Sequence, residues 1–411
     1  MVIESIGAGG VGIARDADGR ILFVPRTAPG DTVEVTHRAA PTARFARARL
    51  LKLVHPGPDR VTPPCPHYDG DGCGGCQLQH LAAAAQRTAK ARIVADAFAR
   101  IARQPIAMPE VVPSPEQWRY RRKATFTLRP HTGGFHAADD PERLVQVTTC
   151  PITDDGVVAA LLETRAAREL LPADEEWRVS VRRLDADTLG AVIDGGRAGA
   201  WPALDAFARA TPRLDAIWWR ARGAPRAMLV LDRRADDGTD AAPAFAQVNA
   251  MLAERLHADV VRAVVALDVQ HVIDAYAGTG AIAREVAAHG AQVSAIEVDP
   301  TACDVARRRA PPSMRVIEGD VASALGSALP ADAIVVNPPR AGLGAEVPPL
   351  LDEAAGDARA LVYVSCDPAT LARDVARLPR WRVAQVRCYD LFPQTAHVET
   401  VVSFVPVESP T

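Results

Sequence analysis

The chain has 411 residues, of which 48% are hydrophobic and 24% are charged, and its formal net charge is −3. This balance excludes a disordered chain and gives no overall signal for a polyanionic partner. No run approaches about 18 apolar residues and no apolar segment follows Met1, so we expect a cytoplasmic monomer without membrane contact. In a reducing compartment, seven cysteines favour metal binding or catalysis over disulfides.

Residues 1–55 are expected to form a small β-barrel. Short alternating apolar runs are separated there by turns rich in Gly and Asp. The segment Val24–Val33 resembles the core of the TRAM domain, an OB-like barrel that binds RNA. From Thr36 to Lys52 the chain has five basic residues and no acid, which suits a polyanion. A solvated arginine-rich face is the alternative.

Residues 56–240 are expected to form a central α/β domain with a cysteine cluster. Cys73 and Cys76 lie in a glycine turn, with Cys65 upstream and Cys150-Pro151 as a distant fourth candidate. Such a set can direct four thiolates at one centre. We rank an iron–sulfur cluster first and zinc second. A redox pair is third because no βαβ pattern frames the Cys-x-x-Cys motif.

The same domain carries a candidate RNA-binding surface. An alanine-rich helix with Arg and Lys on one side is predicted over residues 81–104, and the segment 119–128 enters a strand. Its basic residues alternate with Trp118, Tyr120 and Phe126, a pattern that can bind phosphates and stack a base. The alternative is an edge strand with solvated arginines.

Residues 241–411 are expected to form a Rossmann-like domain. A helix should begin at residues 245–249 and run to about Leu256. A strand then leads through Gly278-Thr279-Gly280 into a helix, and Glu297 ends the next strand, where it can accept from ribose hydroxyls. This motif alone leaves NAD open. S-adenosylmethionine is favoured by Asp320 after the third strand and by Asn337-Pro338-Pro339-Arg340 after the fourth.

The run Leu361–Val364 predicts a buried strand that ends in Ser365-Cys366-Asp367-Pro368. Ligands of open α/β sheets lie just beyond the carboxyl ends of the strands, so the thiol should face a cleft. Near the C-terminus, Glu399 begins a last hairpin strand. A buried strand-end thiol and an exposed acid are the alternatives for these two residues.

The motifs together resemble the RNA (uracil-5-)methyltransferase family. The matching pieces include Cys-Gly-Gly-Cys-Gln-Leu-Gln-His from Cys73, the Asn-Pro-Pro-Arg turn, the Ser365–Asp374 motif and the Phe392–Glu399 motif. The chain departs from the family's usual pattern in Asn337, where Asp is common, and in a longer interval between Cys65 and Cys73. It also has Ala281 where Asn is frequent.

The resemblance implies methylation of C5 of a uridine in RNA. The reaction needs a thiolate that adds to C6, a base that removes the C5 proton and a methyl donor. Cys366 fits the nucleophile and Glu399 the base. The resemblance further implies the S-adenosylmethionine contacts Gln247, Tyr276, Gly278, Glu297, Asp320 and Asn337, and the 4Fe-4S ligands Cys65, Cys73, Cys76 and Cys150.

The barrel and the cysteines resemble the branch of the family that acts on 23S ribosomal RNA. A transfer RNA methyltransferase is the first alternative, and a non-catalytic RNA-binding or ribosome assembly protein is the second. An NAD-dependent enzyme is a third reading. Asn-Pro-Pro also occurs in amino-group methyltransferases, but their chemistry needs neither Cys366 nor Glu399.

Overall fold

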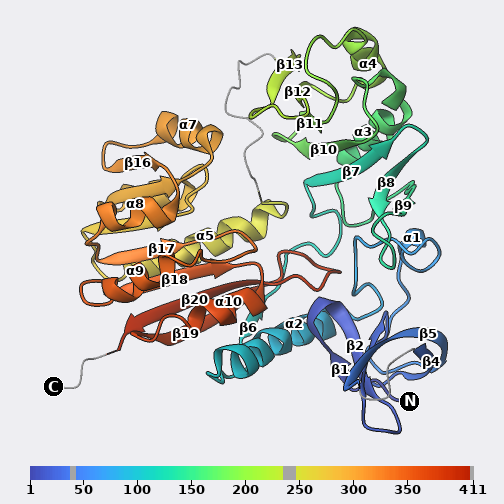
Figure 1. The fold of residues 1–411 in the computed structure, drawn as a ribbon, viewed down its shortest axis with the longest axis horizontal. Helices are drawn as coiled ribbons and strands as arrows, with labels where there is room; N and C mark the ends of the chain where they lie inside the picture. The colour runs from blue at the N-terminus through green and yellow to red at the C-terminus, as the bar shows by residue number, and fades with distance from the viewer. Residues whose placement is uncertain (38–42, 235–246, 408–411) are drawn as a thin grey trace.

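The computed structural model describes residues 1–37, 43–234 and 247–407 and arranges them around three β-sheets (Figure 1). Arg38 of the basic run, Phe245, Ala246 and the boundary expected at residues 240–241 lie outside these ranges. In Figure 1 the N-terminal sheet lies at the lower right, the central sheet above it and the C-terminal sheet on the left. Among the described residues, no helix has both the length and the apolar character needed to cross a bilayer.

The N-terminal sheet closes on itself. Its strand order is β1-β2-β3-β5-β4, and Val2 bridges Thr32 at the start of β4, which completes the circle. Alternate residues of β2 and β3 are buried, so a small apolar core lies inside the closed sheet. The elements are β1 (Ser5–Ile6), η1 (Ala8–Gly10), β2 (Val11–Arg15), β3 (Ile21–Pro25), β4 (Thr32–His37) and β5 (Phe45–His55). A small barrel was expected here, and its TRAM character stays a prediction.

The central sheet has seven strands in the order β13-β12-β11-β10-β7-β8-β9. Helix α3 packs on β7, β10 and β11 and covers an apolar core that includes three tryptophans. The strands are β7 (Lys123–Arg129), β8 (Thr132–His136), β9 (Leu144–Val145), β10 (Trp177–Arg183), β11 (Leu189–Asp194), β12 (Ala216–Arg220) and β13 (Met228–Asp232). The helices are α1 (Pro66–Asp69), α3 (Asp155–Ala166), η3 (Arg168–Leu170) and α4 (Leu204–Ala210).

Two expectations for the central segment are wrong. Tyr120 and Phe126 were expected to stack a base, but they are 3% and 1% exposed because both pack into the interior. The alternative of an edge strand is wrong as well, because β7 lies between β10 and β8. The predicted helix is present, but its basic residues do not all face one solvated side, since Lys90 is completely buried.

The C-terminal sheet has eight strands in the order β16-β15-β14-β17-β18-β20-β19-β6. The first five are parallel, and β20 returns antiparallel beside β18. The strands are β14 (His271–Ala275), β15 (Gln292–Glu297), β16 (Met314–Glu318), β17 (Ala333–Val336), β18 (Ala360–Ser365), β19 (Trp381–Tyr389), β20 (Glu399–Pro406) and β6 (Glu110–Val112). The strand order reverses direction between β14 and β17, which is where such sheets bind ligands.

Helices cover both faces of this sheet (Figure 1), each face having its own apolar core. The helices are α2 (Ala83–Ala97), the π-helical turn η2 (Phe98–Ala102), α5 (Ala250–Val265), α6 (Ala281–Ala288), α7 (Pro300–Arg309), α8 (Val321–Ala328), α9 (Val347–Ala354) and α10 (Pro368–Val375). Helix α2 and strand β6 come from the segment assigned to the central domain, yet they pack with the C-terminal sheet.

The helix expected from residues 245–249 to about Leu256 has other limits. It begins at Ala250, because the Asn249 side chain caps it by accepting from the Leu252 N–H at 3.3 Å, and it continues to Val265. Its apolar face repeats through Val260, Val261 and Val264, which are all buried, so the helix continues as long as that stripe does.

Candidate active site

Cys366 lies directly after β18, at the carboxyl edge of the sheet. The strand ends here because Asp367-Pro368 begins a helix: the Asp367 side chain accepts from the Thr370 N–H at 2.8 Å, and Pro368 occupies the first turn. The Ser365 hydroxyl bonds to the Asp367 carbonyl at 3.1 Å and fixes the turn. Cys366 is half-buried.

Glu399 lies opposite Cys366. In the antiparallel pair of β18 and β20, Ser365 is paired with Thr400, so one further step along both strands brings Cys366 and Glu399 face to face. Glu399 is 3% exposed, and this burial raises the pKa of its carboxyl to about 7. A carboxyl with that pKa can take up a proton near neutral pH.

Arg340 is the charged neighbour of both residues. Burial raises the pKa of the Cys366 thiol, and the Glu399 charge adds to the rise, whereas Arg340 lowers it through its charge and a hydrogen bond. Arg340 also opposes the raised pKa of Glu399. The motif analysis quoted this residue as part of the Asn-Pro-Pro-Arg turn but did not assign it a role. The signal available in the sequence was a basic residue just after the strand that precedes the strand ending at the cysteine.

A buried carboxylate holds the loop that follows Arg340. Asp374 on α10 is fully buried and accepts from the Tyr363 hydroxyl at 2.8 Å and the Leu343 N–H at 2.9 Å. Arg373 bonds to the same carboxylate and to the Ala341 carbonyl at 2.8 Å. These contacts join α10, β18 and the loop, so Arg340 and Cys366 are supported by one network. Asp374 ends the quoted motif, yet sequence reasoning did not single it out.

The glycine loop after β14 forms the other half of the site. The Gly278 N–H donates to Glu297 Oε2 at 2.7 Å, and Glu297 Oε1 accepts from the N–H groups of Val298 and Asp299 at 2.9 and 2.8 Å. Glu297 is therefore held at the end of β15 beside the loop. Gly280 has φ +72°, and a Cβ there would come within 2.6 Å of the Met314 Cε atom, so the position requires glycine.

Tyr276 and Asp320 belong to the same edge. Tyr276 follows β14 with φ +62°, and burial together with the nearby Asp320 charge raises the pKa of its hydroxyl to about 12. Asp320 follows β16 and caps α8 by accepting from the Ala322 N–H at 2.8 Å. Asp274, which precedes the loop, is buried and accepts from the Ala283 N–H at 3.1 Å; burial raises its pKa to about 7.

Asn337 and Gln247 complete the predicted set. Asn337 follows β17, and its N–H donates to the Ala275 carbonyl at 3.2 Å, so it lies at the reversal of strand order next to the end of β14. Gln247 is half-buried and lies just ahead of α5. The structure therefore brings the strand-end residues to one edge of the sheet, with Cys366 and Glu399 at the same edge, and leaves the placement of the Gln247 side chain to a proposal.

The comparisons with known proteins agree with this geometry. A 23S rRNA (uracil(1939)-C(5))-methyltransferase, RlmD, of Chromohalobacter salexigens is 31% identical over 98% of this chain and 88% of its own length. The chain belongs to the RNA (uracil-5-)methyltransferase family. An uncharacterized RNA methyltransferase of Nitratidesulfovibrio vulgaris is 32% identical over 98% of this chain and 94% of its own. The family model described as tRNA (Uracil-5-)-methyltransferase matches residues 326–405.

The comparison with solved structures shows the same fold. The crystal structure of the Pyrococcus abyssi tRNA (uracil-54, C5)-methyltransferase with S-adenosyl-L-homocysteine superposes with a TM-score of 0.69. It covers 98% of this chain and 100% of its own, at 23% identity. This likeness shows the shared fold. The predicted family, the α/β methyltransferase fold and the enzymatic character are thereby confirmed.

In this RNA (uracil-5-)methyltransferase, the four predicted cluster ligands meet in one place. Cys65, Cys73, Cys76 and Cys150 line a single cavity of about 600 Å³. Cys65 precedes α1, and Cys73 pairs with Ala137 across an isolated bridge, so segments distant in sequence converge. All four thiols are free, and no carboxylate is among the residues that line the cavity. Thiolate-only donor sets suit iron–sulfur clusters and zinc.

The electrostatics of these thiols differ from those of Cys366. Burial raises the pKa of Cys65, Cys73 and Cys76, to about 12 for Cys76, and the neighbouring cysteines add to the rise. Within the described parts of the chain, no group of three or more His, Cys, Asp or Glu side chains is already arranged around a metal ion. The thiols thus share a cavity without forming a finished coordination site.

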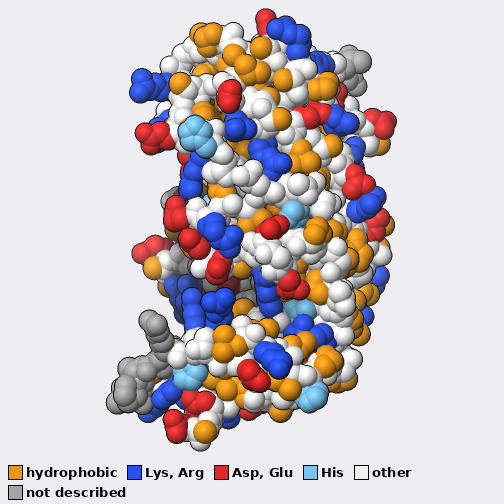
Figure 2. All heavy atoms as spheres, turned by 90° about the vertical axis from the view of Figure 1, so that its right-hand side faces the viewer, with side chains coloured by type: hydrophobic (Ala, Val, Ile, Leu, Met, Phe, Trp, Pro, Cys, Tyr) orange, Lys and Arg blue, Asp and Glu red, His pale blue; other side chains and the backbone are white. Residues whose placement is uncertain are grey.

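The cavity extends from the cysteines toward the active site, and the residues that line it include neither Cys366 nor Glu399. Its lining also includes Arg340 and His397 from the active-site side, and Arg121 and Arg178 from the central sheet. Burial lowers the pKa of His397 to about 4, so its imidazole is neutral at pH 7. Figure 2 shows Lys and Arg side chains gathered between the central domain at the top and the N-terminal barrel at the bottom. A basic, hollowed surface of this kind suits a phosphate backbone.

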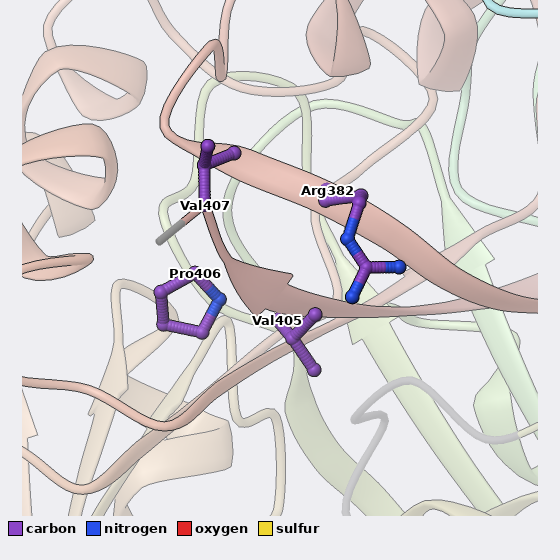
Figure 3. A pocket seen from close by; sticks show the side chains of 4 residues that line it. All are labelled: Arg382, Val405, Pro406 and Val407. Carbon is purple, nitrogen blue, oxygen red and sulfur yellow. The ribbon is translucent and has the colours of Figure 1, made fainter. Parts of the chain in front are cut away.

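A second cavity, of about 710 Å³, lies elsewhere. Its lining consists of Arg382, Val405, Pro406 and Val407 (Figure 3). Val405 and Pro406 lie at the far end of β20 from Glu399, Arg382 pairs with Val405 from β19, and the lining carries no nucleophile or titrating acid. Despite its larger volume, we therefore place no chemistry there.

Proposed function

We propose that this enzyme transfers a methyl group from S-adenosylmethionine to C5 of a uridine in RNA, with Cys366 bonded covalently to C6 during the reaction. The observation that carries the proposal is the register of β18 and β20, whose last pair, Ser365 and Thr400, puts Cys366 next to Glu399, with the Arg340 charge acting on both. A nucleophile, a base and a cation therefore meet at the edge of the sheet where the methyl donor is expected.

The chemistry assigns one task to each group. The Cys366 thiolate adds to C6, which turns the ring into an enolate with a nucleophilic C5. C5 then attacks the methyl group of the sulfonium and releases S-adenosylhomocysteine. Glu399 takes the C5 proton, the C6–S bond breaks and the thiolate leaves. Arg340 favours the thiolate before addition and after elimination, because its charge lowers the pKa of Cys366.

We assign the methyl donor to the edge formed by the glycine loop and the neighbouring strand ends. Glu297 would accept from the ribose hydroxyls, and Asp320 would accept from the adenine amino group. Gly278 lets the backbone approach the ligand, while Tyr276, Gln247 and Asn337 would line the methionine and adenosine. Glu297 already uses both oxygens for backbone N–H groups, which fixes its orientation for a ribose.

The RNA substrate we favour is 23S ribosomal RNA. The Chromohalobacter relative, which aligns over nearly the whole chain, is named for that substrate. Transfer RNA is the alternative, since the Pyrococcus structure and the matching family model carry that substrate in their names. The target base has to leave its stack to reach Cys366, and the basic cavity offers a path for the flanking strand. Cytoplasmic location and a monomeric state remain predictions.

We further propose that Cys65, Cys73, Cys76 and Cys150 hold a 4Fe-4S cluster, with zinc as second choice. The four free thiols that line one cavity, together with His67 and His136, support this assignment. A bound cluster would supply cationic iron that stabilises the four thiolates and ties together the segments that carry them.

The test uses RNA transcribed with 5-fluorouridine. Fluorine at C5 cannot leave as a cation, so the enzyme should remain bonded to RNA after methyl transfer and migrate as a slow band on a denaturing gel. Cys366→Ala should form no such band. Cys388→Ala, which removes a buried thiol of β19, is the matched control and should form it. If the wild-type protein forms no adduct with 5-fluorouridine RNA, the non-catalytic RNA-binding alternative is favoured.

A second experiment identifies the substrate. Ribosomal RNA and transfer RNA from cells that lack this protein would be incubated with the enzyme and S-adenosylmethionine, and 5-methyluridine would be mapped in both. We expect the modification to appear in 23S ribosomal RNA. If the modification appears in transfer RNA alone, transfer RNA is the substrate and the proposed mechanism is unchanged.

A further inference from the structure

Helix α2 carries two long polar side chains in the interior of the protein. Gln86 is 1% exposed and Lys90 is completely buried, although lysine and glutamine side chains are mostly found at the surface. The two residues are four positions apart, so they lie on the same face of the helix. That face meets the loop of residues 390–398, which joins β19 to β20 and ends at Glu399.

Both side chains bind this loop directly. Lys90 Nζ donates to Asp390 Oδ1 at 2.5 Å and to the Phe392 carbonyl at 2.9 Å, and Asp390 is also completely buried. Gln86 Nε2 donates to Gln394 Oε1 at 2.9 Å, while Gln86 Oε1 accepts from the Gln394 N–H at 2.9 Å. The contacts connect residues about 300 positions apart in the sequence.

The loop is held along its whole turn by groups outside the parallel strands. Four consecutive carbonyls, of residues 391–394, each accept a hydrogen bond from a distant segment. The donors are Asn249 Nδ2 to Leu391, Lys90 Nζ to Phe392, the Tyr120 hydroxyl to Pro393, and the N–H groups of Gln77 and Leu78 to Gln394. Gln394 has φ +69°, a conformation that a non-glycine residue keeps only when its surroundings impose it.

This degree of support exceeds what closing a hairpin requires. A two-strand connection is fixed by its own turn and the register of its strands, yet here the loop takes partners from α2, the cysteine-bearing segment and the start of α5. The loop also delivers two groups to the site, His397 in the cavity and Glu399 opposite Cys366. A base acts only within hydrogen-bond reach of its proton, so the position of the loop decides whether Glu399 can act.

We propose that Gln86 and Lys90 are positioning residues that hold the loop of residues 390–398 so that Glu399 can remove the C5 proton after methyl transfer. The inference rests on the proposed function, because it assigns a partner to the proposed base. It separates two halves of the reaction. Addition of Cys366 and methyl transfer depend on β18 and the glycine loop, whereas proton removal and release of the product depend on α2.

The experiment follows both halves with ordinary uridine RNA that carries tritium at C5. Lys90→Met and Gln86→Leu should still form the covalent RNA adduct at a rate within about threefold of wild type. Release of tritium should slow on the order of 10- to 100-fold, because a displaced base loses its alignment. The adduct should therefore accumulate and be visible on a denaturing gel, whereas wild type forms the adduct without accumulating it.

Three further variants make the outcome readable. Glu399→Gln is the reference and should accumulate the adduct. Arg183→Met, which breaks the ion pair with Asp154 in the central sheet, is the control and should behave as wild type. Lys90→Met leaves the buried Asp390 carboxylate without its partner and can fail to fold. Lys90→Met combined with Asp390→Asn removes that charge, and Gln86→Leu leaves no charge without a partner.

The outcomes distinguish this inference from the proposed function. If Glu399→Gln accumulates no adduct, the proposed base is wrong. If it does accumulate adduct while the Gln86 and double variants release tritium at the wild-type rate, the positioning role is overturned. Loss of adduct formation and tritium release in equal measure would overturn it as well, because a purely structural role lowers both. Slow release with normal adduct formation supports it.

Discussion

Two thiol sites in this chain show how one residue type can take two chemical roles. Cys366 lies alone at a strand end, and Arg340 lowers the pKa of its thiol against the effect of burial. In the cysteine cavity, burial raises the pKa of Cys65, Cys73 and Cys76, and the neighbouring thiols raise it further. A guanidinium therefore opposes the effect of burial at Cys366, whereas in the cysteine cavity the neighbouring thiols reinforce it and Arg26 is a weaker opposing charge beside Cys73.

The difference indicates what each site needs in order to form thiolates. At Cys366 a guanidinium partly offsets the rise in pKa that burial causes, which favours the thiolate form needed by a nucleophile that must also leave again. Several thiolates in one cavity repel one another, so a positively charged centre has to enter before they can all ionise. A nucleophile and a set of metal ligands are therefore distinguished by the source of the compensating charge.

The largest expected effect comes from substituting one cysteine of each site in turn. Cys366→Ser should lower the methylation rate by about 10⁴-fold or more, because a hydroxyl is a far weaker nucleophile than a thiolate, and should not change the content of the proposed metal. Cys76→Ser should lose the metal and destabilise the protein on the order of 3 kcal/mol. Methyl transfer from labelled S-adenosylmethionine, iron and zinc analysis under anaerobic conditions, and Tm measure the three quantities.

Cys388→Ala is the control for both substitutions, since Cys388 is a buried thiol of β19 outside either site. It should keep both the metal and most of the activity. Stoichiometric zinc in the wild-type protein would mean that the four cysteines hold zinc and not a 4Fe-4S cluster. Retention of the full metal content in Cys76→Ser would remove that residue from the ligand set.

A smaller effect is expected where the internal cation is removed. Arg340→Gln should slow adduct formation on the order of tenfold at neutral pH, because the thiolate loses its compensating charge, and the rate should recover as the pH is raised. Arg340→Lys should recover part of the loss at neutral pH. The measurement is the pH dependence of adduct formation with 5-fluorouridine RNA. A uniform loss at every pH would instead assign Arg340 to substrate binding.

The residues that the sequence located correctly are those whose role depends on local order. Cys366 could be placed at a strand end because an apolar run stops at an Asp-Pro helix start, and both features are neighbours in sequence. The glycine loop and the acids after β15 and β16 follow the same logic. In parallel α/β units the strand ends meet at one edge, so local patterns are sufficient to assemble this half of the site.

The residues that the sequence missed depend on long-range pairing. Lys90 looked like one more basic residue on a solvated helix. Nothing near it in the sequence shows that its partner in the fold is Asp390, which lies 300 residues further along the chain. Tyr120 looked like a stacking platform, yet its hydroxyl bonds to the Pro393 carbonyl at 2.9 Å in the interior. Amphipathic patterns report which face is apolar, and they do not report a buried polar pair.

The last of the expected effects concerns the stability of the folded protein rather than the rate. Burial raises the pKa of Glu399 from 4.5 to about 7, so the folded state binds a proton more tightly than the unfolded state. This contribution to stability is fully present below pH 4.5 and is lost as the pH rises through about 7. The interval corresponds to about 3 kcal/mol, at about 1.4 kcal/mol for each pH unit.

Glu399→Gln removes this dependence, because the amide stays neutral at every pH. The variant should therefore gain stability relative to wild type between pH 5 and pH 8, by an amount approaching about 3 kcal/mol, measured from urea unfolding at both values. Glu353→Gln, on the exposed side of α9, should show no such change and serves as the control. A constant difference between variant and wild type would mean that Glu399 is already ionised at pH 5. It would then be a weaker proton acceptor, and the elimination step would need another base within reach of C5.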